Sequence, residues 1–134
     1  MSIARTLRFA LVLGAVAVSS GCVVNTTPNN SPGSVAVDWT INGSIDPNYC
    51  TLSSAATFRL TIYDSHGASV GSYDSACTNF SVVVDLQPDT YTADALFVDA
   101  GGKARTTTAT LAPFTIYRNT VTTVPADFPN SSFF

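Results

Sequence analysis

The residues that could carry out chemistry in this chain of 134 residues are three cysteines, one histidine and nine aspartates, and glutamate is absent. A Ser-His-Asp nucleophile would need His66 as its base, yet the sequence has no Gly-x-Ser-x-Gly elbow. A zinc site needs more imidazoles or thiolates than the chain offers, and Gly101-Gly102 has the spacing of a turn rather than of a phosphate-binding loop. The sequence therefore favours a protein that is not an enzyme and that uses no cofactor.

Four aspartates fall in segments expected to be loops: Asp46, Asp64, Asp89 and Asp99. Loop carboxylates at the end of a β-sandwich can gather around Ca²⁺, although the dense Asp-x-Asp-x-Asp-Gly spacing of a calcium loop does not occur here. An isolated Asp in a turn more commonly accepts hydrogen bonds from nearby backbone N–H groups. Calcium binding is kept as an alternative function, and so is a carboxylate-dependent hydrolase, for which paired carboxylates would be needed.

The N-terminal residues 1–21 have the layout of a signal peptide. Arg5 and Arg8 supply positive charge, and residues 9–18 follow without a charged side chain. As a helix this apolar segment would rise about 15 Å, which is half the hydrocarbon thickness of a bilayer and too short for a settled transmembrane span. We therefore expect residues 1–21 to direct export and to be removed.

The residues around the expected cleavage site resemble the lipobox of bacterial lipoproteins, which ends in a small residue followed by an invariant cysteine. Gly21-Cys22 and Ser20 fit that pattern, and Ser19 stands where the family usually has Leu. The resemblance implies that the Cys22 thiol takes a diacylglycerol and that the new amino terminus takes a further acyl chain such as palmitate, which together hold a protein stably at a membrane. An ordinary secretory signal, with Cys22 merely adjacent to the cut, is the alternative.

Residues 22–34 would then be the lipidated cysteine and a flexible tether, because residues 23–34 are rich in Asn, Pro, Ser and Gly and lack hydrophobic periodicity. Val23 occupies the position where Asp signals inner-membrane retention in some lipoproteins, so the resemblance favours the outer membrane of the cell envelope. Cleavage also leaves four basic residues against nine acidic ones. A surface of that charge does not favour nucleic acid as a partner.

From residue 35 the hydrophobic pattern has period two, which is typical of half-buried strands. Val37, Trp39 and Ile41 alternate with polar residues in the first run, so Trp39 is expected in the core. Turn signals separate the runs, and His66 lies in one of them as a residue surrounded by water. The expected strands are residues 35–42, 57–63, 68–73, 80–86, 90–98, 103–111 and 114–124, with an irregular loop at 44–55.

The corner Leu86-Gln87-Pro88-Asp89-Thr90-Tyr91 resembles the Leu-x-Pro-Gly-x-Tyr corner of immunoglobulin-like, transthyretin-like and carboxypeptidase-regulatory-like sandwiches. The resemblance implies that Tyr91 packs its ring inward while its hydroxyl satisfies nearby backbone. Seven short strands without an amphipathic helix predict one all-β domain, a seven-stranded antiparallel β-sandwich at residues 35–128, followed by a tail at 129–134. A membrane barrel is disfavoured, because it needs at least eight longer strands with a lipid-facing apolar band.

With Cys22 assigned to lipid, Cys50 and Cys77 remain, and an even pair in an exported protein implies a disulfide bond. On the chain-entropy model such a bond contributes roughly 3.5 kcal/mol. The alternatives are a redox pair or metal thiolates, but the chain has neither a Cys-x-x-Cys spacing nor a histidine near the two cysteines. The sequence therefore predicts a structural Cys50–Cys77 bridge and assigns no metal ligands.

Trp39 and four tyrosines could furnish an aromatic contact patch for a partner, and Tyr63 is a better surface candidate than Trp39 because it lies opposite the apolar face of its strand. The other three tyrosines are Tyr49, Tyr73 and Tyr117. The expected protein is a lipid-anchored cell-envelope module without catalytic activity, held at the membrane through Cys22. Its partner would be an envelope protein or a glycan, bound through loops or an exposed edge strand, or else the module is a structural spacer.

Overall fold

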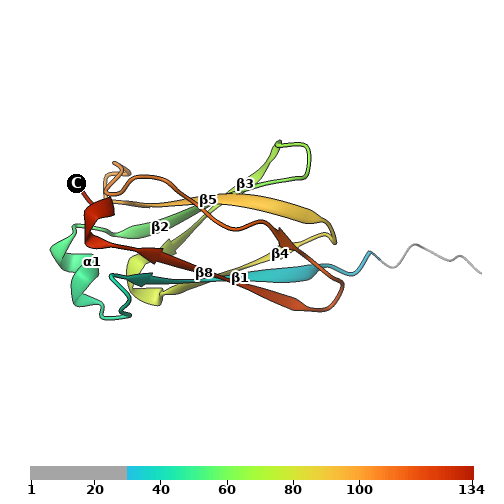
Figure 1. Ribbon diagram of the computed structural model, residues 1–134, viewed down its shortest axis with the longest axis horizontal. Helices are drawn as coiled ribbons and strands as arrows, with labels where there is room; N and C mark the ends of the chain where they lie inside the picture. The colour runs from blue at the N-terminus through green and yellow to red at the C-terminus, as the bar shows by residue number, and fades with distance from the viewer. Residues whose placement is uncertain (1–29) are drawn as a thin grey trace, which may run out of the picture.

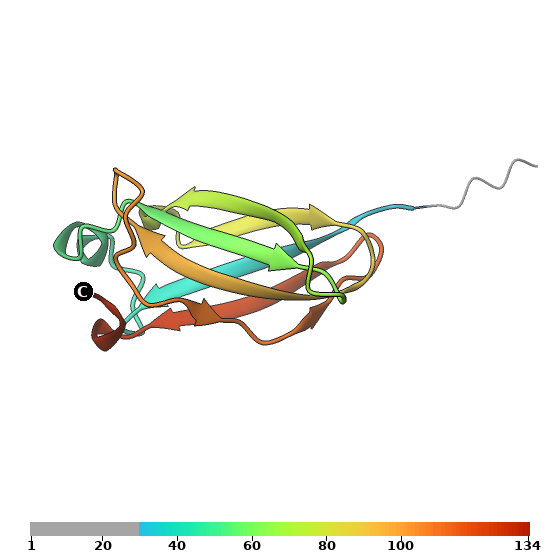
Figure 2. The same ribbon diagram turned by 90° about the horizontal axis from the view of Figure 1, so that it is seen from above.

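The structure of the protein, a computed structural model, describes residues 30–134. Eight strands in this range form two sheets that pack face to face as a β-sandwich (Figure 1, Figure 2). The predicted signal peptide, Cys22 and the predicted tether up to residue 29 lie outside the described residues. No helix among residues 30–134 is long and apolar enough to cross a membrane.

The smaller sheet has three strands in the order β4-β1-β8. β1 (Gly33–Ile41) is central, β4 (Ser81–Leu86) pairs with it in antiparallel orientation, and β8 (Val121–Phe128) pairs with it in parallel orientation. The odd-numbered side chains of β1 from Val35 to Ile41 are at most 1% exposed, as their alternation predicted. The even-numbered side chains therefore form the outer face of this sheet.

The larger sheet has the order β3-β2-β5-β6, with β7 paired to the beginning of β5. Its long strands β2 and β5 have the bounds that the period-two pattern predicted, and the apolar residues at alternate positions face the core in both. A bulge between Ile62 and Tyr63 shifts the register of β2 against β3. The strands are β2 (Thr57–Tyr63), β3 (Ser69–Ala76), β5 (Thr90–Val98), β6 (Ala109–Thr110) and β7 (Phe114–Thr115).

The all-β class is confirmed, but the seven-stranded antiparallel arrangement is not, because the chain has eight strands and one mixed sheet. The predicted strand at 103–111 is reduced to β6 and an isolated bridge at Ala104. In between, the Phe97 N–H donates to the Thr106 hydroxyl at 3.0 Å, so a side chain takes the place of a main-chain acceptor. The predicted strand at 114–124 divides into β7 and β8, and β8 crosses to the other sheet.

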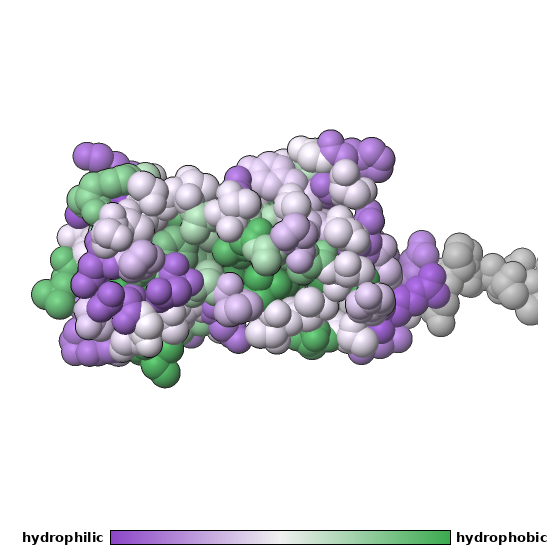
Figure 3. Space-filling view, in the orientation of Figure 1, coloured by the Kyte–Doolittle hydropathy of each residue, from purple (hydrophilic) through white to green (hydrophobic). Residues whose placement is uncertain are grey.

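Aromatic rings fill the space between the sheets. Trp39, 1% exposed, stacks on Phe58 with 3.9 Å between ring centroids, and its indole N–H donates to the Cys77 carbonyl at 3.1 Å. The predicted core position of Trp39 is therefore confirmed. Figure 3 shows apolar residues gathered in the middle of the face toward the viewer. Leu111 and Phe114, each 6% exposed, also belong to the core.

The corner between β4 and β5 has the local structure that the resemblance implied. Tyr91 is 5% exposed and stacks on Phe114, and its hydroxyl donates to the Gln87 carbonyl at 2.9 Å. The Asp89 carboxylate accepts a hydrogen bond from the Thr90 N–H at 2.7 Å. A carboxylate thus stabilises the turn at the position where related corners have Gly.

The last six residues, expected as a tail, lie against the sandwich. η2 (Asn130–Ser132) turns the chain back after β8, and Phe133 forms a bridge with Thr106. The Phe133 ring stacks on Phe97 at a centroid distance of 5.9 Å. The core therefore continues beyond residue 128.

Candidate functional site

The two ends of the sandwich carry different features. The first described residues enter β1 at one end, and the C-terminus lies at the opposite end (Figure 1). We call these the N-terminal end and the far end. Thr57 pairs with both Ala76 and Val98, so the segments that adjoin these three residues meet at the far end. They are α1 (Asn48–Leu52), η1 (Cys77–Asn79) and the turn at 99–102.

A disulfide bond joins Cys50 on α1 to Cys77 on η1, with 5.9 Å between the Cα atoms, as the even cysteine pair predicted. The two residues are 4% and 1% exposed, so both sulfur atoms are enclosed as well as bonded. α1 lies in the segment 44–55, which was expected to be irregular. Pro47 sits at its N-cap with φ −63°, an angle that suits the start of a helical turn.

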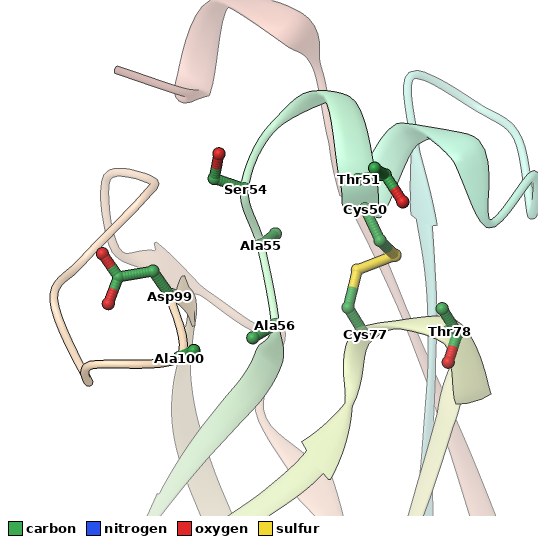
Figure 4. Close-up of a pocket in the computed structure, with 9 residues that line it drawn as sticks. All are labelled: Cys50, Thr51, Ser54, Ala55, Ala56, Cys77, Thr78, Asp99 and Ala100. Atoms are coloured by element: carbon green, nitrogen blue, oxygen red, sulfur yellow. A yellow bond between two sulfur atoms is a disulfide. The ribbon is translucent and has the colours of Figure 1, made fainter.

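A hollow of about 450 Å³ opens at the far end beside the disulfide (Figure 4). In the close-up the disulfide lies on one side, Asp99 and Ala100 lie on the other, and the segment from Ser54 to Ala56 runs between them. The lining is a mixture of small apolar side chains, three hydroxyls and one carboxylate: Cys50, Thr51, Ser54, Ala55, Ala56, Cys77, Thr78, Asp99 and Ala100. These groups can donate and accept hydrogen bonds, and none of them is a nucleophile paired with a base.

A second hollow, of about 620 Å³, lies where β1 and β8 approach the far end. Its walls are mainly apolar, and two carboxylates border them. The lining residues are Asp38, Trp39, Thr40, Ile45, Phe80, Pro125, Ala126 and Asp127. The sequence analysis missed this site because its residues come from four separate segments. Asn42-Gly43 was a usable signal, since a tight turn there folds Ile45 back beside β1.

The four candidate calcium ligands do not come together. Asp64 and Asp89 flank Tyr63 and Thr90, which lie at the N-terminal end, whereas Asp46 and Asp99 lie at the far end. Within residues 30–134 no three His, Cys, Asp or Glu side chains are grouped so that they could hold a metal ion. The calcium alternative therefore has no ligand set in this part of the chain.

Each of these carboxylates is instead engaged by its own turn. Asp46 accepts the Asn48 N–H at 2.9 Å, and Asp99 accepts the N–H groups of Gly101 and Lys103 at 2.9 Å. Asp64 accepts two backbone N–H groups of the β2–β3 turn, and these bonds, chiefly the one from Ala68, hold the pKa of Asp64 below its usual range.

His66 is exposed at the tip of the β2–β3 turn, as predicted. Its ring Nδ1 lies 3.5 Å from the Ser65 hydroxyl, at the outer limit of a hydrogen bond. The backbone N–H of His66 donates to the Asp64 carboxylate. These three residues are consecutive in the chain and surrounded by solvent. They lack the enclosed site and the oxyanion donors that nucleophilic catalysis uses.

The tyrosines do not form a single patch. Tyr117 is 64% exposed in the loop at the N-terminal end, whereas Tyr63 is only half-buried on the outer face of the larger sheet. Tyr49 and Tyr73 are partly buried against the core, at different places. Tyr63 is more accessible than the buried Trp39, as predicted, and Tyr117 is exposed as well.

No family model matches this chain, and no curated protein matches it. Among solved structures, a DUF1812 protein from Bacteroides thetaiotaomicron, provisionally described as polysaccharide-binding, has a TM-score of 0.42 and 8% sequence identity. The match covers 69% of this chain and 46% of that one, so this chain spans less than half the length of the similar structure. A likeness at that level transfers no property from one protein to the other.

Proposed function

We propose that this chain is a non-catalytic binding module of the bacterial cell envelope, held at the outer membrane by lipid on Cys22. The observation that carries the proposal is the position of the two hollows relative to the start of the domain. The chain enters at the N-terminal end, and both hollows lie toward the far end. The predicted tether, residues 22–34, ends two residues earlier because Gly33 and Ser34 belong to β1, and a domain tethered through residues 22–32 would present both hollows away from the membrane.

The chemistry of the described side chains supports binding over catalysis. Among residues 30–134, the carboxylates that line the hollows face no histidine, and His66 lies at the other end of the molecule. Enzymes concentrate ionisable groups in a concave site, where burial and neighbouring charges shift their pKa values. Here hydrogen bonds lower the pKa of Asp64 in an exposed turn and of Asp127 at the border of the second hollow, and burial acts in the opposite direction on both.

A glycan is a second candidate ligand, and the hollow beside the disulfide is the observation that favours it. The hydroxyls of Thr51, Ser54 and Thr78 and the carboxylate of Asp99 can bond sugar hydroxyls, while the adjacent alanines offer small apolar contacts. A panel of envelope polysaccharides tested against the full chain and its Asp99→Ala variant would reveal such binding. Equal signals from both proteins would remove this candidate.

The anchor is tested by labelling living bacteria with an alkyne analogue of palmitate. We expect the full chain to take up the label and to sediment with outer membranes. Cys22→Ala should take up no label, whereas a Cys50→Ala/Cys77→Ala control should be labelled like the natural chain. A mass spectrum of the natural N-terminus with an unmodified Cys22 thiol would refute the anchor.

A further inference from the structure

The outer face of the smaller sheet exposes two large apolar side chains, one on each of its edge strands. Val83 on β4 and Val121 on β8 are 60% and 65% exposed, and both point outward because their partners on β1, Ala36 and Ser34, are even-numbered. Ile45, 67% exposed, lines the hollow on the same face. Three of the large exposed apolar residues of the domain therefore share one face.

The outer face of the larger sheet is different in character. Arg59 on β2 forms a two-pronged ion pair with Asp74 on β3, with both nitrogen-to-oxygen distances at 2.8 Å. The hydroxyl of Thr61 lies 3.4 Å from that of Ser72 on the same two strands. On that face one of the two carboxylates, Asp74, is paired with a cation, and the other, Asp94, accepts a threonine hydroxyl, so the two faces are not equivalent surfaces.

The smaller sheet carries carboxylates on its outer face without a matching cation. Asp38 lies there on β1, Asp85 on β4 and Asp127 on β8. The one ion pair found within residues 30–134 is Arg59–Asp74, on the other sheet. Negative charge on this face is therefore left for an external cation to balance.

The hollow on this face, which we call the sheet groove, combines both properties. The β1–β8 register places Asp38 beside Pro125, and Thr40 beside Asp127, so the two carboxylates are diagonal neighbours on adjacent strands. Ile45 and Pro125 provide apolar walls around a volume of about 620 Å³.

Asp127 is held in place before any ligand arrives. Its Oδ1 accepts hydrogen bonds from the Thr40 hydroxyl at 2.6 Å and from the Gly43 N–H at 2.9 Å. The Thr40 bond and then the Gly43 bond lower the pKa of Asp127, so the carboxylate is ionised at neutral pH. Both of these bonds use the same oxygen, which leaves Oδ2 able to accept a donor from a ligand.

We propose that the sheet groove binds a segment of another protein in which a lysine or arginine stands beside an aliphatic residue. The cationic head bonds Asp127 and Asp38, and the aliphatic stem packs along Ile45 and Pro125. Beyond the groove the same face presents further apolar side chains, Ala36 and beside it Val83, farther away than a small amine would reach, which favours a peptide. This inference rests on the proposed function, because it names the partner of the binding module.

The test uses nuclear magnetic resonance of the full chain, labelled with ¹⁵N and carrying Cys22→Ala, in detergent micelles. The probes are the peptides acetyl-Val-Lys-Val-amide and acetyl-Val-Arg-Val-amide, with acetyl-Val-Gln-Val-amide as the neutral control. We expect either cationic peptide to shift the amide signals of Thr40, Ile45 and Asp127, and the Gln peptide to shift them much less. Because the variant carries no lipid, failure of the anchor leaves this measurement unaffected.

Variants distinguish binding at the groove from non-specific electrostatic binding to an acidic protein. Asp127→Asn and Asp38→Asn should each lower the affinity for the cationic peptides by roughly threefold. Asp94→Asn is the matched control, since Asp94 also lies on a strand and accepts a threonine hydroxyl, from Thr110 at 2.8 Å, but on the larger sheet. Raising the ionic strength from about 0.01 M to about 0.15 M should weaken binding as well.

Three results would overturn the proposal. One is the absence of shifts at the groove amides with either cationic peptide, and another is an equal response to the Gln peptide. The third is self-association of the chain that Arg118→Gln abolishes, because the exposed Tyr117-Arg118 loop has the same basic and apolar character. In that case the occupant of the groove is a second copy of this chain.

Discussion

Replacing both Cys50 and Cys77 by alanine should lower the free energy of unfolding, because it removes the cross-link between α1 and η1. The bond joins residues 27 apart in sequence, and the chain-entropy relation gives about 3.5 kcal/mol for a loop of that length at 25 °C. The backbone bonds around the cysteines, such as that from the Ala55 N–H to the Cys50 carbonyl, do not depend on the sulfur atoms. The loss therefore reports on the cross-link itself.

The measurement is urea unfolding followed by the fluorescence of Trp39, the one tryptophan of the chain. Its indole is buried against Phe58, so unfolding exposes it to water and shifts its emission to longer wavelength. For a domain of this size, 3.5 kcal/mol corresponds to a fall in Tm of roughly 15–20 °C. The urea m value should rise, because an unfolded chain without the cross-link exposes more surface.

Two comparisons make the result decisive. The natural chain, unfolded and reduced, should refold to the stability of the double variant, and Thr78→Ala, beside the bond, should change stability little. A loss below about 1 kcal/mol with an unchanged m value would refute the entropic account.

Three further changes test the fold. Tyr91→Phe should lower the free energy of unfolding by about 1 kcal/mol, because it removes the donor of a corner carbonyl, whereas Tyr117→Phe, at an exposed ring, should not. Gly33→Ala should cost about 2 kcal/mol, because its new Cβ meets backbone and a buried side chain, whereas Gly101→Ala has room. The lowered pKa of Asp127 means that its ionised form stabilises the fold. That stabilisation is complete above the ordinary carboxyl pKa of 3.8 and is lost as the pH falls below the folded-state pKa. The free energy of unfolding of Asp127→Asn should therefore fall less steeply with decreasing pH at the acid end.

All three are read from the same urea titrations. Equal losses for the two tyrosine variants would show that the corner hydrogen bond does not stabilise the fold. Equal losses for the two glycine variants would show that backbone entropy, and not close approach, sets the cost at Gly33. If the free energy of unfolding falls as steeply at acid pH in Asp127→Asn as in the natural chain, the assigned direction of the Asp127 pKa shift is contradicted.

Local sequence signals predicted the parts of the fold that depend on neighbouring residues. Alternation identified β2 and β5 with their observed bounds, because a half-buried strand needs apolar residues at every second position. The proline corner was equally local, and the Cys50–Cys77 bridge was predicted once Cys22 was assigned to lipid. Each of these features is determined by a few residues and one physical requirement.

Pairing between distant segments could not be predicted in this way. Alternation in β1 shows which side chains face the core, but it does not say that β8, rather than a hairpin neighbour, lies beside it in parallel. The Thr-rich segment 103–111 has strand composition, yet the Thr106 hydroxyl replaces the main chain as acceptor and the ladder is broken. The sheet groove depends on that same β1–β8 pairing, so the Asn42-Gly43 turn signal could indicate only the position of Ile45 and not the groove as a whole.

The parallel pairing of β1 with β8 also determines how the domain bears a load. β1 is hydrogen-bonded to β4 along one side and to β8 along the other. A pull on residue 30 away from the far end acts along the axis of β1, whereas the inter-strand bonds run across that axis. Both ladders are then strained in shear, with all their bonds loaded together instead of peeled one after another. The first strand of the domain is thus a mechanical clamp, placed where a tether would transmit force.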